Sequence, residues 1–497
     1  MAEIWEVLTT VLVGFLILDF LKLLWSSRDY PPGPLPLPLI GGLWFIGTKL
    51  SKDSFTKLSK QYGDICTVWV WHQPVVVISG FHAIKESLSN HSQDFANRPI
   101  SSFLLKVGKG KGVAFANGPA WKEQRTFTIN ALRQLGLGKK DMESKLQEVA
   151  HQLVETFART KGQPMDPLPF INASVCNMIC VLNFGYRFSP EDTKFQMILE
   201  YISNYTKFGG SAFLLLYELF PWLVKHIPGP HQKIEASIQT GKSIIKEEAE
   251  KHSQDLALRQ PKDFLDLYLL QIGKKQSEPN STFDSENMAH CIMELFVAGT
   301  ETTGCFLKWA LLLMAMYPDI QDKVYKEMET ILGPSGSICY EDRWKLPYTQ
   351  AVLHEIMRSK YFMLFGFPRE TVKNVNVCGV SIPKGTFILA NFRSVLHDPK
   401  QWENPKEFNP NNFLDKEGNF TKKVEFLPFG TGARICLGEH LARHESFLLF
   451  TNLLRSFKLQ LPEGVKELNQ EPLIGITLHP QPFKICAIPH CRSSLNR

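Results

Sequence analysis

One cysteine lies in a glycine-rich turn whose residue types suit the binding of a metal-containing cofactor. The stretch reads Phe429-Gly-Thr-Gly-Ala-Arg-Ile-Cys-Leu-Gly438, and an amphipathic helical pattern follows from Glu439 to about Phe457. A thiolate that ligates the metal of a large planar cofactor needs an open approach, which glycines allow because their backbone passes close to it. The guanidinium of Arg434 can pair with a carboxylate of that cofactor. An inert buried cysteine is the alternative, and five constrained positions in this short stretch argue against it.

The longest helical pattern of the chain runs from Asp284 to Tyr317 and ends where Pro318 prevents its continuation. From Cys291 onward it is apolar on nearly every side, which predicts a helix that passes through the core. Its middle departs from this pattern, because it reads Ala298-Gly-Thr-Glu-Thr-Thr303.

The adjacent acid and hydroxyl groups of this polar stretch can move protons. A glycine inside a helix costs about 1 kcal/mol relative to alanine, and a buried carboxylate is costly as well. We therefore expect the helix to open locally at Gly299 and to form a groove beside the cofactor. Glu301 and Thr302 would then relay protons to bound oxygen. A satisfied polar kink in a core helix is the alternative interpretation.

Two further pairs of residues stand at helical spacing, although each is unspecific by itself. Glu355 and Arg358 are at i and i+3, the spacing of an ordinary ion pair on a helix. Trp121 and Arg125 are at i and i+4, so an indole N–H and a guanidinium point the same way and suit one carboxylate. A surface packing contact is the alternative for the second pair.

Along the chain the motifs follow in the order Trp121 and Arg125, Glu301 and Thr302, Glu355 and Arg358, and the cysteine loop. In this order they resemble the motifs of the cytochrome P-450 family, and the resemblance covers the whole chain. The cysteine loop matches the haem-binding pattern Phe-x-x-Gly-x-Arg-x-Cys-x-Gly in full. The resemblance implies a mainly α fold with small β-sheets, in which one large catalytic domain follows an N-terminal membrane anchor. It also implies haem b, whose iron takes the thiolate of Cys436, and a structural role for Glu355 and Arg358. The residues that it assigns to the cofactor are Arg98, Trp121, Arg125, Arg369, Phe429, Arg434, Cys436 and Gly438.

The sequence departs from the family pattern at two positions. Leu364 stands where a proline is usual before Pro368, and Asn412 stands where an arginine is often found. Because of the first change, the family pattern does not predict the backbone rigidity or the pocket shape near the haem. The second predicts that an ion pair with Glu355 is lost or replaced by a neutral hydrogen bond. Relatives vary at this second position, so we do not interpret it as inactivation.

Several segments, such as Phe95-Ala-Asn-Arg98-Pro and Pro228-Gly-Pro-His-Gln, are similar in wording to microsomal family 2 and, within it, to subfamily J. The resemblance implies a monooxygenase that inserts one oxygen atom from O2 into lipophilic xenobiotics or polyunsaturated fatty acids such as arachidonate. Electrons would come from NADPH through a flavoprotein reductase, with cytochrome b5 as a further candidate partner. Mostly apolar residues are expected to line the substrate pocket: Phe103, Leu104, Phe208, Phe213, Leu295, Phe296, Ala298, Phe365, Ile476 and Thr477.

Two other functions remain open at this point. A haem-thiolate isomerase would rearrange lipid peroxides without external electrons and would tolerate the loss of the acid–alcohol pair. A membrane haem-binding protein without turnover would be favoured if the changes at Leu364 and Asn412 left the haem loosely held. The monooxygenase ranks first because Glu301 and Thr302 are both present.

Residues 4–25 form an apolar stretch that is long enough to span a bilayer, with Asp19 as its one flaw. Trp5 and Trp25 would lie about 30 Å apart in a helix, which matches an aromatic belt at each membrane face. Acidic residues precede the span and basic residues follow it, which places the N-terminus in the lumen. A cleaved signal peptide is the alternative, but the basic n-region is missing. We expect a single-pass anchor at 1–27, a proline-rich hinge at 28–45 and a cytosolic monooxygenase domain at 46–497, in the endoplasmic reticulum membrane.

The composition argues against several other classes of function. With 44% hydrophobic and 21% charged residues, the 497-residue chain is ordinary for a globular protein. Its formal charge of +6 is mild, so no nucleic-acid partner is expected. The ten cysteines form no CxxC pairs, which favours a reducing compartment. A zinc site at Cys436, His440 and His444 is excluded, because on one helix the outer two would lie about 12 Å apart.

Overall fold

The computed structural model describes residues 2–46, 54–135, 140–256, 259–333, 338–465 and 467–490. These residues form mainly helices with small sheets, which confirms the predicted fold class. The chain divides into two compact units, and each is described by itself. Unit 1 consists of Met1–Pro99, Leu364–Lys406 and Val424–Cys436, and unit 2 of Ile100–Met363, Glu407–Lys423 and Leu437–Arg497.

A four-stranded sheet organises unit 1. Its first two strands, β1 (Ile65–Val70) and β2 (Gln73–Ser79), form an antiparallel hairpin, because β-branched and aromatic residues favour a pleated backbone. Trp71 turns the chain between them with a φ of 54°. Strand β6 (Phe387–Asn391) pairs with β2 in parallel, and β3 (Arg369–Glu370) completes the order β1-β2-β6-β3. The sheet edge thereby fixes the backbone of Arg369, one of the predicted cofactor residues.

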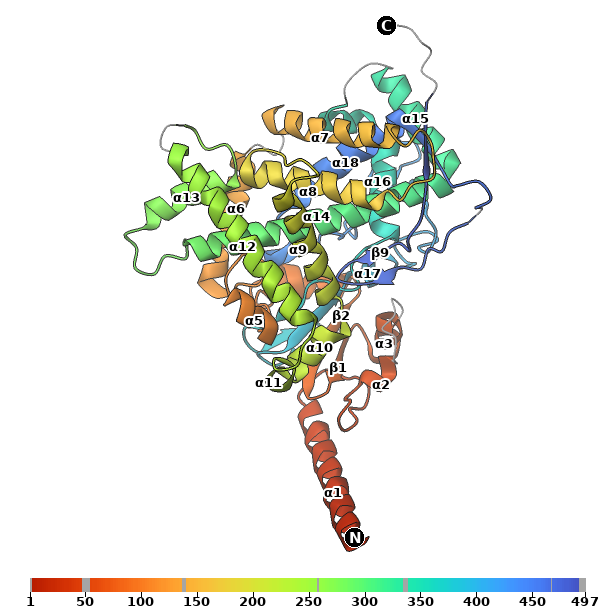
Figure 1. Cartoon of the computed structure of the whole chain (residues 1–497). Coiled ribbons are helices and arrows are strands. Elements are labelled where there is room, and N and C mark those ends of the chain that lie inside the picture. The colour runs from red at the N-terminus through yellow and green to blue at the C-terminus, as the bar shows by residue number, and fades with distance from the viewer. Residues whose placement is uncertain are drawn as a thin grey trace. The chain divides into compact units, whose positions relative to one another are not determined.

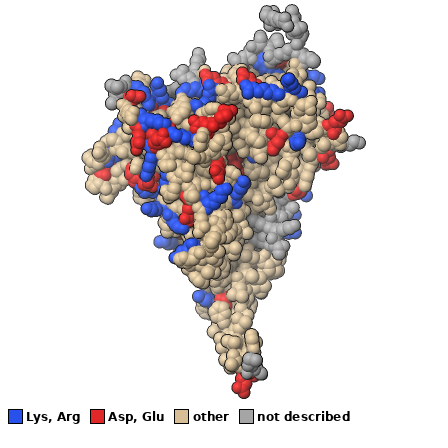
Figure 2. Space-filling model, in the orientation of Figure 1, with Lys and Arg blue, Asp and Glu red and all other residues tan. Residues whose placement is uncertain are grey.

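The N-terminal helix α1 (Ala2–Ser27) is long and apolar enough, over Glu3–Ser27, to cross a membrane. Figure 2 shows its largely uncharged surface, with acidic residues at its N-terminal end. Asp19 interrupts the apolar run, and its carboxylate lies 3.2 Å from Nε2 of His72 in the same unit. A polar partner lowers the cost of burying that carboxylate. The other elements of unit 1 are α2 (Leu43–Ile46), α3 (Ser54–Tyr62), α4 (Phe81–Lys85), η1 (Glu86–Asn90), β4 (Val375–Val377), β5 (Val380–Ile382), α17 (Phe392–Leu396) and η5 (Gly432–Arg434).

Unit 2 is built around the long helix α14 (Ser285–Met316). The helices that pack against it (Figure 1) include α8 (Leu168–Phe184), α9 (Thr193–Gly209), α12 (Pro230–Asp255) and α18 (Glu439–Ser456). The side chain of Asp284 caps the helix by accepting a hydrogen bond from the N–H of Asn287 (2.7 Å), and Pro318 begins the next helix. Residues 303–315 are all buried, which confirms the predicted core helix.

Helix α14 is continuous through Gly299, so the predicted local opening is wrong. A Cβ at this position would lie only 2.4 Å from Cδ1 of Ile179 on α8. The glycine therefore lets two core helices approach each other closely, and that packing offsets its lower helix propensity.

The remaining elements of unit 2 complete its helical layers and two small sheets. They are α5 (Ser102–Gly108), α6 (Gly118–Gln134), α7 (Lys140–Ala158), α10 (Ala212–Leu219), α11 (Pro221–Val224), α13 (Phe264–Lys275), α15 (Pro318–Leu332), η3 (Tyr340–Lys345), α16 (Pro347–Ser359), η4 (Pro410–Phe413), β7 (Phe457–Gln460), β8 (Leu473–Ile474), β9 (Leu478–His479) and β10 (Cys486–Pro489). The nine cysteines among the described residues form no disulfide, and Cys491 lies outside the described residues.

Candidate active site

The cysteine loop ends the last segment of unit 1, and glycine fixes its shape. Gly432 has a φ of +75°, and a Cβ there would lie 1.5 Å from the carbonyl oxygen of Leu88 in η1, so no side chain fits. The backbone N–H of Cys436 donates to the carbonyl oxygen of Phe429 (3.1 Å) and closes the turn. Cys436 itself is exposed. The loop therefore leaves the Cys436 side chain accessible, and its role as the iron ligand stays a prediction.

Three arginines predicted to hold the cofactor are buried in unit 1. Each donates to backbone carbonyl oxygens of that unit: Arg98 to Phe367 and Pro368 (2.9 and 2.7 Å), Arg369 to Thr431 (3.0 Å) and Arg434 to Ala96 (2.7 Å). These bonds hold the planar guanidinium groups, which form strong bonds to carboxylates. A soft thiol and three buried guanidinium groups in one unit form a set of donors that fits haem b, with its iron and two propionates.

The other predicted cofactor residues lie in unit 2. Trp121 is buried and Arg125 is half-buried on α6, one turn apart and therefore on the same face of that helix. Gly438 precedes the first residue of α18. The roles of these three residues toward a haem propionate or the cysteine loop stay predictions.

The acid and the alcohol of α14 have different partners. Oε1 of Glu301 accepts a hydrogen bond from the hydroxyl of Thr477 (2.6 Å) and lies 2.6 Å from Nε2 of His479. The hydroxyl of Thr302 donates to the carbonyl oxygen of Ala298 (2.6 Å), which leaves its oxygen lone pairs to accept. Burial by itself would raise the pKa of Glu301, but the hydrogen bonds from His479 and Thr477 hold the pKa below its usual range.

Sequence reasoning missed His479 as a partner of Glu301. The sequence predicts Ile476 and Thr477 as residues of the substrate pocket. In the structure the Thr477 hydroxyl donates to Glu301, and the place of Thr477 in the substrate pocket stays a prediction. No spacing rule links two residues so far apart in the chain, so a single sequence carries no signal for this contact.

A second buried acid, Glu445 on α18, accepts a bond of 3.4 Å from the hydroxyl of Thr303 on α14. Burial raises the pKa of Glu445 from 4.5 to about 8. Between these two values the folded chain holds a proton that the unfolded chain lacks, so stability falls as pH rises, by about 1.4 kcal/mol per pH unit. Glu445→Gln is expected to remove this slope in denaturant unfolding between pH 5 and pH 8.

The matched control for that variant is Glu417→Gln, because Glu417 is exposed. It is expected to leave the pH slope unchanged. Equal slopes for Glu445→Gln and the unsubstituted chain would contradict the assignment of a proton to Glu445.

The residues predicted to line the substrate pocket fall into several groups. In unit 2 the rings of Phe103 and Phe208 lie 4.5 Å apart, and Phe213 stacks on His231 at 5.6 Å. Glu218 on α10 accepts a bond from the N–H of Phe103 (3.1 Å), which fixes the start of α5. The other groups are Phe296 against Phe184 (5.6 Å), Ile476 against Gly209, and buried Leu295, half-buried Leu104 and exposed Ala298. Phe365 belongs to unit 1, where it packs on Phe55 at 5.9 Å.

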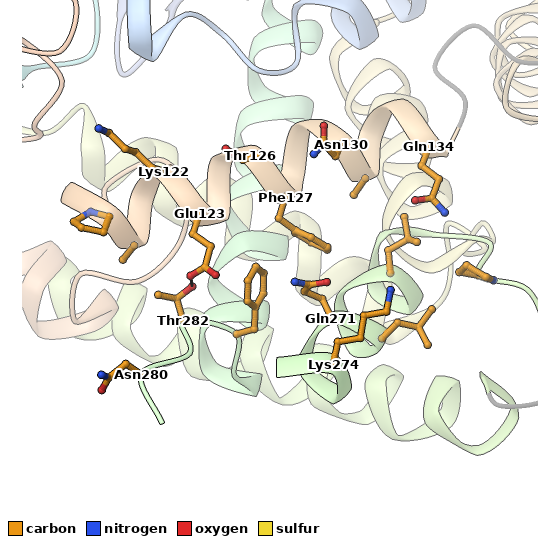
Figure 3. Close-up of a pocket in the computed structure, with 17 residues that line it drawn as sticks. Lys122, Glu123, Thr126, Phe127, Asn130, Gln134, Gln271, Lys274, Asn280 and Thr282 are labelled. Carbon is orange, nitrogen blue, oxygen red and sulfur yellow. Dashed lines mark hydrogen bonds between the residues drawn. The ribbon is translucent and has the colours of Figure 1, made fainter. Parts of the chain in front are cut away.

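A separate hollow of about 920 Å³ lies between α6 and α13. Figure 3 shows Phe127 and Gln134 of α6 on one side of it and Gln271 and Lys274 of α13 on the other. The hydroxyl of Thr282 closes one end by donating to Glu123 (2.5 Å). None of its lining residues is a predicted cofactor or substrate residue.

The Glu355–Arg358 pair is fully buried in unit 2. Nε and Nη2 of Arg358 donate to the two carboxylate oxygens of Glu355 (2.7 and 2.6 Å), and Nη2 also donates to the carbonyl oxygen of Glu407 (3.0 Å). The amide of Asn412 lies 3.4 and 3.5 Å from the same carboxylate. The predicted replacement of an ion pair by a neutral hydrogen bond is thus confirmed, with a long bond. Leu364 is buried in unit 1.

Comparison with known proteins agrees with these features. The family model described as Cytochrome P450 matches residues 31–487. The chain is 38% identical to Cytochrome P450 2J2 of Homo sapiens over 98% of either chain. It is also 40% identical to Cytochrome P450 2C29 of Mus musculus, over 92% of this chain and 94% of that protein. The match reaches from the proline-rich segment past the cysteine loop, so the chain belongs to the cytochrome P450 family, with haem-thiolate iron as its cofactor and monooxygenation as its activity.

Proposed function

We propose that this chain is a membrane-anchored monooxygenase of lipophilic compounds, either xenobiotics or polyunsaturated fatty acids such as arachidonate. The observation that carries the proposal is the exposed thiol of Cys436 in a glycine-fixed loop, in the same unit as three buried arginines. The similarity to proteins named Cytochrome P450 2J2 and 2C29 supports the choice of family 2 substrates.

The residues divide the work in the following way. When bound, the haem supplies the activation of dioxygen and the transfer of one of its oxygen atoms to a carbon–hydrogen bond or to a carbon–carbon double bond. Cys436 would hold the iron as a thiolate. Phe429 and Gly438 shape the turn around the sulfur. Arg98, Arg369 and Arg434 would neutralise or hydrogen-bond the haem propionates, and the family resemblance assigns the same role to Trp121 and Arg125.

Proton supply is the task of Glu301 and Thr302. Oγ1 of Thr302 accepts a hydrogen bond while its hydroxyl proton is donated to the carbonyl oxygen of Ala298, and the hydroxyl can donate elsewhere when that bond opens. Glu301 lies one residue before Thr302 and receives and returns protons there. Its partners hold it as a carboxylate at neutral pH. The apolar side chains around Phe103 and Phe296 exclude water and orient an apolar substrate.

The chain's location and partners follow from the same proposal. Residues 1–27 anchor it once in the endoplasmic reticulum membrane, 28–45 form a proline-rich hinge, and 46–497 form the cytosolic monooxygenase domain. The length and apolar composition of α1 support the anchor. Electrons come from NADPH through a flavoprotein reductase, with cytochrome b5 as a second donor.

Oxygen isotope labelling tests the proposal. The full chain, loaded with haem, is placed in membranes with reductase and NADPH, and receives heavy O2 with arachidonate beside a panel of lipophilic drugs. One heavy atom in an NADPH-dependent product is the expected result. Rearrangement of an added hydroperoxide without heavy oxygen would favour a haem-thiolate isomerase instead. Neither product, from a haem-loaded chain with active reductase, would indicate a haem-binding protein without turnover.

Thr302→Ala is expected to uncouple electron use from product formation. NADPH oxidation continues, while product per NADPH falls roughly tenfold, because the proton path loses its hydroxyl. The measurement is product and NADPH consumed in the same reaction. Thr303→Ala is the control, because the adjacent hydroxyl donates to Glu445. Coupling that is unchanged in Thr302→Ala would remove Thr302 from the proton path.

A further inference from the structure

A continuous chain of polar contacts in unit 2 ends at Glu301. Nζ of Lys308 lies 3.1 Å from Nδ1 of His479, and Nε2 of His479 lies 2.6 Å from Oε1 of Glu301. Glu301 and Lys308 are about two turns apart on α14 and therefore lie on the same side of it. His479, which comes from β9, bridges them.

Strand β9 is held firmly in this position. The indole N–H of Trp309 donates to the carbonyl oxygen of Leu478 (2.8 Å), and the N–H of Leu478 donates to the carbonyl oxygen of Phe362 (2.7 Å). The hydroxyl of Thr477 donates to Glu301 (2.6 Å). Bonds made by the two residues before His479 thus fix the backbone that carries its ring to the two charged groups.

The three side chains lie in a largely buried, charged setting. Lys308 is only 6% exposed, and burial lowers the pKa of its ammonium, against smaller opposing effects of nearby acidic groups. Its cost as a buried cation is offset by the carboxylate at the other end of the chain. Outside the three members of the cluster, Asp166 and Cys305 act on the charge of Lys308, and Nζ of Lys360 lies over the Trp309 ring at 5.0 Å.

The donor and acceptor groups give this series of hydrogen bonds a direction. An ammonium group has three N–H donors and no acceptor, so Nδ1 of His479 must accept from Lys308. A neutral imidazole then carries its proton on Nε2, which lies 2.6 Å from Oε1 of Glu301 and 2.8 Å from the hydroxyl oxygen of Thr477, whose own proton is donated to Glu301. Each member therefore donates toward Glu301, which is the arrangement that a proton relay requires.

We propose that Lys308 and His479 supply protons to Glu301, an inference that rests on the proposed monooxygenase function. In the transfer, a proton leaves Nζ of Lys308 for Nδ1 of His479 while the Nε2 proton passes to Oε1 of Glu301. An ammonium and a carboxylate become a neutral amine and a carboxylic acid, and the imidazole stays neutral in its other tautomer. Reset takes a proton from solvent onto Lys308 and returns the imidazole proton to Nε2. His479 is thus a positioning and carrier residue.

Two substitutions at His479 separate relay from positioning. His479→Gln keeps an N–H donor toward Glu301 but cannot pass a proton on, whereas His479→Ala removes both functions. Lys308→Met removes the source, and Lys360→Met is its matched control, because Lys360 lies beside the same tryptophan but outside the chain of bonds. The full haem-loaded chain is assayed with reductase for product per NADPH, KM, pH profile and solvent deuterium isotope effect.

The relay predicts that product per NADPH falls about tenfold in Lys308→Met and in both His479 variants. This loss is smaller than the usual contribution of a positioned acid, because water can replace part of the path. KM stays unchanged, the solvent isotope effect rises and Lys360→Met behaves as the unsubstituted chain. Full coupling in His479→Gln or in Lys308→Met would overturn the relay. If the unsubstituted chain forms no labelled product, the proposed function fails first and the relay fails with it.

An infrared titration gives a readout that does not depend on turnover. The protonated-carboxyl band of Glu301 is assigned by its loss in Glu301→Gln, and the pH at which it appears is compared between variants. His479→Ala is expected to move that pH upward, because burial then acts on a carboxylate that has lost a donor. A band that titrates at the same pH in both chains would show that His479 does not hold Glu301, and would also overturn the relay.

Discussion

Cys436→Ser is expected to abolish oxygenation while the chain remains folded. A serine hydroxyl is a hard, weakly acidic donor and does not replace a thiolate on haem iron. Loss of an outer partner of a metal ligand typically costs 10–100-fold in activity, so loss of the ligand itself is expected to cost at least about 100-fold. The measurement is product formation together with the absorption spectrum of the reduced carbon monoxide complex, which reports thiolate ligation. The Cys436 side chain is exposed, so its replacement leaves no buried cavity.

The matched control is Cys378→Ser, which also alters an exposed cysteine of unit 1. Sγ of Cys378 lies 3.4 Å from Nδ1 of His82, away from the cysteine loop in sequence, and the substitution is expected to leave spectrum and activity unchanged. Retained activity in Cys436→Ser, with a spectrum like that of the parent chain, would contradict the assignment of the thiolate and with it the proposed mechanism.

Local signals account for the parts of the fold that the sequence predicts well. The boundaries of α14 follow from Asp284, which caps the helix, and Pro318, which ends it. The cysteine loop is recognised because its glycines and its arginine stand at fixed offsets, and a turn of this kind is a local structure.

Contacts between distant segments account for the parts that the sequence did not predict. Gly299 is needed because Ile179 of α8 lies against it, and neither residue signals the other along the chain. His479 reaches Glu301 in the same way, through the placement of β9. Asn412 is an intermediate case, because the resemblance to a family predicted its partner Glu355 but not the length of the bond.

Removal of one partner of the buried Glu355–Arg358 pair is expected to have the second large effect. Arg358→Ala leaves the carboxylate of Glu355 buried without its two guanidinium donors, and such a loss typically costs about 3–5 kcal/mol. The free energy of unfolding, measured by denaturant titration of the full chain, should fall by that amount. Burial raises the pKa of Glu355 in spite of Arg358, which shows that desolvation outweighs the attraction within the pair.

That balance predicts a specific difference between single and double variants. Glu355→Met combined with Arg358→Met leaves no buried charge, so the double variant should be less destabilised than the sum of the two single variants. Lys275→Ala is the control, because Lys275 and Glu278 form an i, i+3 pair at the surface whose loss is expected to cost less than about 1 kcal/mol. A change in Arg358→Ala no larger than in Lys275→Ala would contradict the structural role of the pair. Additive effects in the double variant would instead show that each side chain stabilises α16 and the segment around Asn409 independently, through bonds such as that from the Asn409 N–H to Glu355 (3.0 Å).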